Sequence, residues 1–306
     1  MCVKKRALLW ILLLGTMAAL LVWSGPVRQA VQEGLALCGR SVIPSLFPFF
    51  VAAALLVSLG FAQWLGNLLE GFMRPLFGIG GNGAAALVLG LVGGYPVGAR
   101  TAAELYRQGL CTRTEAERLL GFCNNCSPAF VVGILGQGIF GNSRAGAWLY
   151  LIHVLSALLT GLLLRQSGKR PEKAPPRAHL PVPQPETFSG ALVSAVQSGL
   201  QAMLGVCAFV VLFMVVLLPL RSLPGLPGDL LVGAVELFNG AQRLTPDRAG
   251  FILAAGLLGW GGLSVHCQTL SVLAGSGLSA RAYWLGKAVQ GGISAVLALG
   301  ASLLSP

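Results

Sequence analysis

The stretch that decides the fold runs from Leu87 to Gly98 and reads LVLGLVGGYPVG. It is apolar through Val92, after which glycines and Pro96 permit or impose a non-helical backbone. It lies inside a segment between Arg74 and Arg100 that has no charged residue. In lipid, a helix break is tolerated only where the freed backbone groups meet protein, water or ligand. We therefore predict a discontinuous membrane helix broken at Gly93–Gly98, where the break either lines a cavity or forms a tightly packed kink.

The whole chain has the composition of a membrane protein. Of its 306 residues, 55% are hydrophobic and only 10% are charged, whereas soluble domains carry about 25% charged residues. Several uncharged stretches reach the roughly 20 residues that cross a ~30 Å hydrocarbon core. They lie between Arg6 and Arg28, Arg40 and Glu70, Arg74 and Arg100, Arg118 and Arg144, Arg144 and Arg165, Glu186 and Arg221, and Arg248 and Arg281. We predict an all-α polytopic transmembrane protein rather than a soluble enzyme.

Charge and cysteine usage exclude several classes of function. The net charge of +11 comes from basic residues that flank the apolar stretches, as expected for cytoplasmic anchors, so we expect contact with lipid and none with nucleic acid. Cys123-x-x-Cys126 lacks two further zinc ligands nearby, and we expect no metal and no other cofactor. The sequence has no G-x-x-x-x-G-K-[ST], H-E-x-x-H or G-x-S-x-G motif, which predicts that the protein is not an enzyme.

The chain divides into four parts. Residues 1–25 are apolar after a basic start and predict an uncleaved first membrane helix, with a cleaved signal peptide as the alternative. Residues 165–187 are rich in proline and basic residues and predict an extended cytoplasmic linker. This linker separates two halves, residues 26–164 and residues 188–306.

The two halves share short motifs in the same order. Residues 30–35 (AVQEGL) resemble residues 195–200 (AVQSGL), and Gly93-Gly94 recurs as Gly261-Gly262. Basic residues place both the N-terminus and the linker in the cytoplasm. The first membrane helix then carries the start of the first half to the outer face, whereas the second half starts at the cytoplasmic linker. Equivalent helices would therefore begin on opposite faces of the membrane. This predicts an inverted-topology repeat with discontinuous or re-entrant helices, as in many secondary transporters. The alternative is coincidence in a glycine-rich chain.

Three polar places within the uncharged stretches form the candidate substrate site. The first is the break at Gly93–Gly98, followed by Arg100 on a helix face that is either a solvated surface or an anion-attracting vestibule. The second, Asn124–Pro128, heads an apolar run, so it is either a half-helix start that binds a carboxylate or a simple cap. The third is a second break at Gly261–Gln268, whose polar groups serve either function or helix packing. The candidate residues are Gly93, Gly94, Tyr95, Pro96, Arg100, Asn124, Asn125, Ser127, Pro128, Gly261, Gly262, Ser264 and Gln268.

Two local signals predict helix starts close to these places. Thr112-x-x-Glu115 and Thr114-x-x-Glu117 are both capping-box patterns, so a helix should begin near residues 112–114. Thr245-Pro246-Asp247 predicts the start of the helix that carries the second break. We expect the two breaks and the Asn124–Pro128 segment to converge near the middle of the membrane, because grouping them lets one wet cavity satisfy their backbone groups.

Four sequence blocks follow one another along the chain, namely residues 44–50 (PSLFPFF), 73–77 (MRPLF), 93–99 (GGYPVGA) and 110–112 (LCT). Together they resemble the sporulation integral membrane proteins of the YlbJ family, also called stage V sporulation protein V. That family belongs with the nucleoside-recognition or Gate-domain membrane proteins, so the resemblance implies two Gate-like repeats with broken helices, similar to concentrative nucleoside transporters. Cys123 and Cys126 depart from the small polar residues expected beside the asparagines, which affects the inferred substrate preference.

The resemblance also implies a function. The family is associated with endospore formation and with moving dipicolinate across the outer forespore membrane. We predict a transporter of a small polar or anionic metabolite in the bacterial cell membrane or outer forespore membrane. A nucleoside-type permease and a non-transporting scaffold of the sporulation membrane are the alternatives. A coupling ion, a homo-oligomer and other sporulation membrane proteins are open as partners. A buried polar cluster between the breaks would favour transport, and apolar packing there would favour a scaffold.

Overall fold

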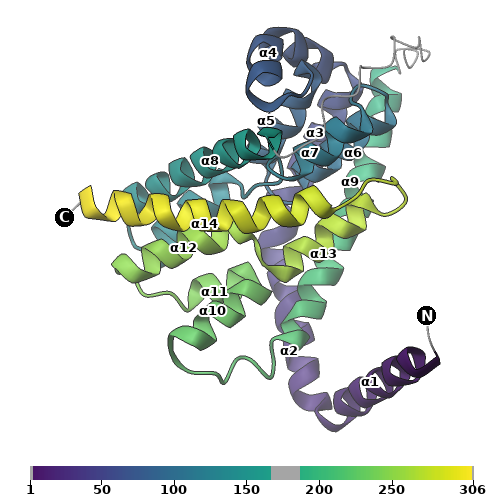
Figure 1. The fold of residues 1–306 in the computed structure, drawn as a ribbon. Coiled ribbons are helices and arrows are strands. Elements are labelled where there is room, and N and C mark those ends of the chain that lie inside the picture. Colours follow the sequence, from purple (N-terminus) through teal and green to yellow (C-terminus); the bar gives the residue numbers. More distant parts are fainter. Residues whose placement is uncertain (1–2, 167–186, 305–306) are drawn as a thin grey trace.

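The computed structural model describes residues 3–166 and 187–304, and in these ranges the chain forms helices and turns without a strand (Figure 1). The first half contains α1 Val3–Val22, α2 Ser24–Leu37, the π-helical η1 Cys38–Val42, α3 Ile43–Ser58, α4 Phe61–Phe77, the 3-10 turn η2 Gly81–Gly83, α5 Ala84–Gly93, α6 Val97–Arg107, α7 Arg113–Leu120, the π-helical η3 Ala129–Ile139 and α8 Ser143–Gln166. The second half contains α9 Phe188–Val216, α10 Gly225–Val235, α11 Leu237–Gln242, α12 Arg248–Trp260, α13 Gly262–Leu273 and α14 Arg281–Leu304. The all-helical prediction is confirmed.

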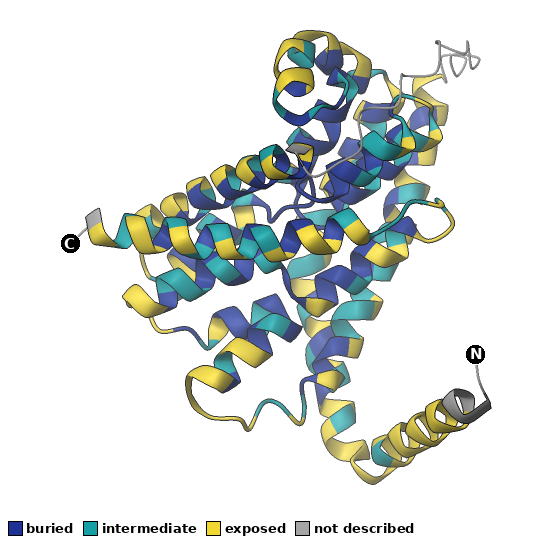
Figure 2. Ribbon diagram, in the orientation of Figure 1, coloured by how far each residue is buried: buried dark blue, intermediate teal, exposed yellow. Residues whose placement is uncertain are grey.

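Several helices in the described ranges are long and apolar enough to cross a membrane. Three qualify singly, namely Ser143–Arg165, Phe188–Val216 and Arg248–Leu273. Up to five qualify if two bent pairs each count as one span, Ala7–Val22 with Ser24–Val42 and Leu46–Ser58 with Phe61–Phe77. The bends are 89° and 78°, respectively. Large apolar side chains such as Leu155, Leu200 and Leu299 are exposed on outer helix faces, as lipid contact requires (Figure 2).

The first helix, α1, projects from the rest of the molecule and exposes apolar side chains along its length (Figures 1 and 2). Ile11, Leu12 and Leu14 are all exposed. An apolar helix with no covering protein is suited to a lipid environment. Most of the predicted linker, residues 167–186, lies outside the described residues, so its conformation stays a prediction.

Two helix starts follow the local signals in the sequence. The Oγ1 atom of Thr112 accepts the Glu115 N–H at 3.2 Å, and the Glu115 carboxylate accepts the Thr112 N–H at 2.9 Å. This capping box begins α7. The second predicted box does not form, because Thr114 lies inside α7 and Glu117 pairs with Arg113 at 2.8 Å. At the start of α12, the Asp247 carboxylate accepts the Gly250 N–H at 2.7 Å, and this bond lowers the pKa of that carboxyl.

Both predicted helix breaks are present. Helix α5 ends at Gly93, Gly94 has a φ of +83°, and α6 begins at Val97. Helix α12 ends at Trp260, and Gly261 and Gly262 have φ values of +93° and +85° before α13 continues. These left-handed conformations are readily adopted by glycine because it lacks a Cβ atom.

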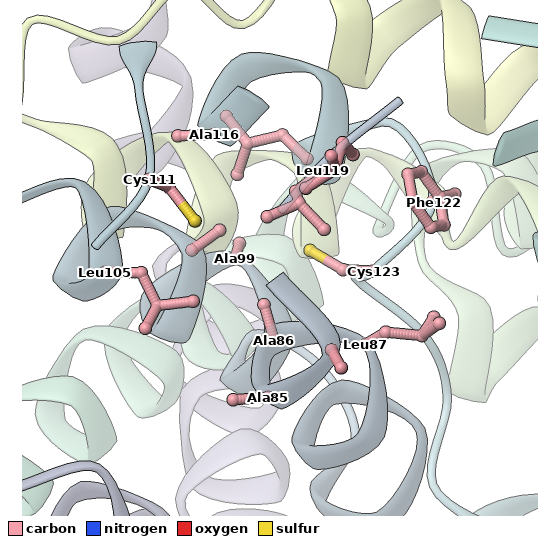
Figure 3. Packing of buried hydrophobic residues seen from close by; sticks show 14 of the residues in the cluster. Ala85, Ala86, Leu87, Ala99, Leu105, Cys111, Ala116, Leu119, Phe122 and Cys123 are labelled. Carbon is pink, nitrogen blue, oxygen red and sulfur yellow. The ribbon is translucent and has the colours of Figure 1, made fainter. Parts of the chain in front are cut away.

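The first break is tightly packed. Alanines of α5 and α6 form much of the surrounding core, and Figure 3 shows Cys123 among Ala86, Ala99 and Leu119. A Cβ atom added at Gly98 would lie 1.9 Å from the Cys123 carbonyl oxygen. The same holds at Gly90 of α5. The loop at residues 121–128 can therefore lie directly against the broken helix, because Gly90 and Gly98 have no side chain at the point of contact.

Helix α14 crosses the middle of the molecule. It runs alongside α12 and α8 (Figure 1). A Cβ atom added at Gly286 of α14 would lie 2.0 Å from the Gly121 carbonyl oxygen, so this helix also contacts the start of the loop at residues 121–128. Each half thus contains a broken helix and, later in the chain, a long final helix. The inverted symmetry of the halves stays a prediction.

Candidate functional site

The three predicted polar segments come together in space. Tyr95, in the first break, donates a hydrogen bond from Oη to the Leu258 carbonyl of α12 at 2.8 Å. Asn124 donates from Nδ2 to Thr269 Oγ1 of α13 at 2.9 Å. A Cβ atom at Gly94 would lie 3.0 Å from the Cβ atom of Ser127. The two broken helices and the segment 124–128 therefore share one crossing point.

Tyr95 satisfies a backbone group that the second break leaves free. Leu258 lies within the last four residues of α12, whose carbonyls have no partner within the helix. A Cβ atom at Gly261 would lie 3.4 Å from Tyr95 Oη, so the phenol rests against the second break itself. The phenol thus replaces the water that a carbonyl at such a break would otherwise need.

Asn124 connects the same two helices from the other side. Its Oδ1 atom accepts the N–H of Ala99, one of the unpaired donors in the first turn of α6, at 3.4 Å. Its Nδ2 atom is occupied by Thr269, and the residue is fully buried. Asn125 is also fully buried and donates to the Phe122 carbonyl at 2.8 Å. Both amides donate to protein acceptors in this structure, so their direct contact with a substrate stays a prediction.

The predicted half-helix start at Ser127 and Pro128 is present, but as a π-helical segment, η3. Ser127 Oγ accepts the Phe130 N–H at 3.4 Å, which gives this hydroxyl the capping role. The N–H of Cys126 donates to His153 Nε2 of α8 at 3.0 Å. Two N–H groups around this start are therefore already used, which favours the capping interpretation over an open anion site.

The polar residues of the second break face inward. Ser264 and Gln268 are buried, and the Gln268 amide donates to Ser264 Oγ at 3.3 Å. His266 is buried between Trp260 and Trp284 and contacts the Tyr283 hydroxyl through Nδ1 at 2.7 Å. Gly262 is buried as well, and a Cβ atom there would lie 3.1 Å from the Leu237 nitrogen.

Two residues of α14, Lys287 and Gln290, complete the crossing and were missed from the sequence. Both are fully buried. Lys287 Nζ donates to Gln290 Oε1 at 2.7 Å, to the Asn124 carbonyl at 3.0 Å and to Tyr95 Oη at 3.3 Å. Gln290 donates from Nε2 to Asn125 Oδ1 at 2.9 Å. Within the described ranges, no carboxylate forms an ion pair with Lys287.

A signal for Lys287 was present in the sequence. It stands with Gln290 three residues later in the otherwise largely apolar segment 282–304. Basic residues beside apolar stretches indicate only the general role of anchors, so the sequence did not single out Lys287 as a candidate site residue. An ionisable residue inside an apolar helix is a candidate functional group in its own right.

Two adjoining cavities lie beside the crossing and share Arg100, Arg107 and Ser198 in their walls. Their volumes are about 260 and 230 Å³. Gln268 of the second break lines the smaller one. Arg107 pairs with Glu104 at 2.5 Å, whereas Arg100 donates from Nη2 to Ser198 Oγ and has no carboxylate partner among the described residues. The structure thus places Arg100 in the wall of a polar cavity, as the vestibule interpretation requires.

Comparison with known proteins finds one family model and a curated relative. The Gate family model, described as nucleoside recognition, matches residues 40–141, which contain the first break and the segment 124–128. The chain is 30% identical, over 311 aligned residues, to a sporulation integral membrane protein, YlbJ, of Bacillus subtilis (strain 168). The alignment covers 89% of this chain and 76% of that protein. No solved structure gives a significant match.

Proposed function

This chain belongs to the YlbJ family of sporulation integral membrane proteins, and from that membership we propose that it transports a small polar or anionic metabolite across the membrane. Dipicolinate, a planar dicarboxylate, is the substrate we propose, and the outer forespore membrane is the location. The role is one of transport rather than catalysis.

One observation carries the proposal, namely the buried polar cluster at the crossing of the two broken helices. A non-transporting scaffold protein would be expected to have apolar side chains packed at this crossing. Instead, the crossing contains the buried polar residues Lys287, Gln290 and Asn124. A buried polar group costs free energy unless it is hydrogen-bonded, and a buried charge costs more. A packed apolar core would serve a purely structural role at a lower cost, so the cluster favours transport.

The arginine-lined cavities supply a route for an anion. Arg100 presents a guanidinium without a carboxylate partner among the described residues, and guanidinium groups bind carboxylates through paired hydrogen bonds. Gln268 links the wall of this space to the second break. We propose that the anion is bound first at Arg100 and then passes the crossing when the half-helices move about the breaks.

Uptake of labelled dipicolinate into liposomes that contain the purified full chain tests the proposal. We expect uptake by the wild-type protein, and an increase in KM of about tenfold or more for Arg100→Gln, because a hydrogen bond to a charged group is worth roughly 1.5–3 kcal/mol. Arg74→Gln is the matched control, since Arg74 is exposed and pairs with Glu70 on its own helix. An unchanged KM for Arg100→Gln would contradict the assigned entry site.

A nucleoside permease is the second candidate, because the matching family model is described as nucleoside recognition. Labelled uridine, offered to the same liposomes, distinguishes the two substrates. Uptake of uridine without dipicolinate would replace the proposed substrate. Uptake of neither, by protein that is folded and inserted, would favour the scaffold.

A further inference from the structure

The ammonium group of Lys287 lies in a site made of oxygen atoms. The three acceptors are a main-chain carbonyl of the loop at residues 121–128, a phenol of the first break and a side-chain amide of α14. They belong to Asn124, Tyr95 and Gln290, at 2.7–3.3 Å from Nζ. None of them is a carboxylate. The ammonium group is therefore hydrogen-bonded by neutral dipoles from its own helix and from two segments that are distant from it in sequence.

Neutral oxygen ligands at helix breaks are also what transporters use to bind small cations. Carbonyls of unwound backbone and the C-terminal ends of half-helices coordinate the coupling ion, because their partial negative charges face the break. Here Tyr95 Oη accepts from Lys287 and donates to the Leu258 carbonyl, near the C-terminal end of α12. The Tyr95 hydroxyl therefore connects the ammonium group, by two hydrogen bonds, to a carbonyl at the negatively polarised C-terminal end of α12.

We propose that Lys287 is a tethered cation that fills a monovalent-cation site at the crossing, so that transport does not require sodium at this position. Its ammonium joins α14, the loop and the first break as a bound ion would. The expected sodium independence of transport rests on the proposed function. The cation site itself does not, because it is a property of the folded protein.

Removal of the side chain should convert the site into one that accepts a free cation. In Lys287→Ala the three oxygens remain, and the space of the lysine side chain and ammonium becomes free. We expect the Tm of the detergent-solubilised full chain to be higher in sodium or methylammonium chloride than in choline chloride of equal ionic strength. The expected difference is roughly 2–4 °C. Choline is too large for a site shaped by an ammonium group.

Matched variants separate this effect from general salt effects. Arg281→Ala, an exposed position on the same helix, should show no such difference, and neither should the wild type. Lys287→Met fills the space with apolar atoms and should also be insensitive to the cation. Equal Tm values for Lys287→Ala in all three salts would overturn the proposal, as would a wild type that gains as much from sodium as that variant.

The inference can also be tested on the wild-type protein alone, by measuring uptake with and without sodium, in case the Lys287→Ala variant does not fold. Uptake into liposomes should proceed equally well when sodium is replaced by choline on both sides. Uptake that requires sodium would overturn the inference while leaving transport itself established. If no substrate is taken up at all, the proposed function fails, and the Tm comparison still decides whether the cation site exists.

Discussion

Replacement of Gly98 by alanine should disrupt the crossing of the two broken helices. The added Cβ atom would lie 1.9 Å from the Cys123 carbonyl oxygen and 2.7 Å from its carbon. To reach ordinary contact near 3.4 Å, the loop backbone must retreat by about 1.5 Å. Backbone atoms cannot rotate away as a flexible side chain can, so the loop itself must move.

The displacement affects the next residue of the loop, Asn124. Its side chain accepts the Ala99 N–H, and its carbonyl accepts the Lys287 ammonium at 3.0 Å. Overpacking costs about 1–3 kcal/mol, and each weakened hydrogen bond adds roughly 0.5–1.5 kcal/mol. The free energy of unfolding should therefore fall by about 2–6 kcal/mol. For a chain of 306 residues this corresponds to a decrease in Tm of roughly 3–10 °C.

A thiol-reactive fluorescent dye provides the assay, because Cys123 and Cys126 are buried and become reactive only when this region opens. Gly292→Ala is the control, since a Cβ atom at this position of α14 meets no atom within 4 Å. Alanine is favoured over glycine in a helix by about 1 kcal/mol, so this control should be neutral or slightly stabilising. If Gly98→Ala unfolds at the same temperature as Gly292→Ala, the described close approach is wrong.

Three further predictions follow from other parts of the molecule. Asn124→Ala should lower the free energy of unfolding by roughly 1–3 kcal/mol, because the N–H of Ala99 and the hydroxyl of Thr269 lose a hydrogen-bond partner. Chemical denaturation of the purified protein measures this change, and unchanged stability would show that these hydrogen bonds are weak. Thr112→Ala should cost about 0.5–2 kcal/mol through loss of the α7 cap, whereas Thr114→Ala should cost less; equal losses would contradict the assigned helix start. A protease added to sealed vesicles should cut within residues 167–186 only from the cytoplasmic side, and cleavage from the opposite side would reverse the predicted topology.

The sequence by itself determined the class of protein and the positions of the breaks. The class follows from composition, since long uncharged stretches can be covered only by lipid or by other apolar helices. The breaks at Gly94 and Gly261 follow from backbone torsions that only glycine adopts easily. The capping signals of Thr112 and Asp247 also gave correct helix starts, because each involves residues only three positions apart. Composition is a property of the whole chain, and the breaks and caps depend on a few neighbouring residues, so none of these predictions requires knowing which distant segments are in contact.

Only the tertiary structure decided which polar groups meet. Tyr95 pairs with Leu258, Asn124 with Thr269, and Lys287 with both Tyr95 and Asn124, in each case across a large part of the chain. Local patterns cannot select among such pairs, because every buried polar group needs a partner and many combinations would satisfy that need. The choice depends on how closely the backbones approach, and the glycines at Gly98 and Gly286 allow that approach only where the loop at residues 121–128 lies against them. For this reason the sequence did not single out Lys287, although in the folded protein it lies at the centre of the crossing.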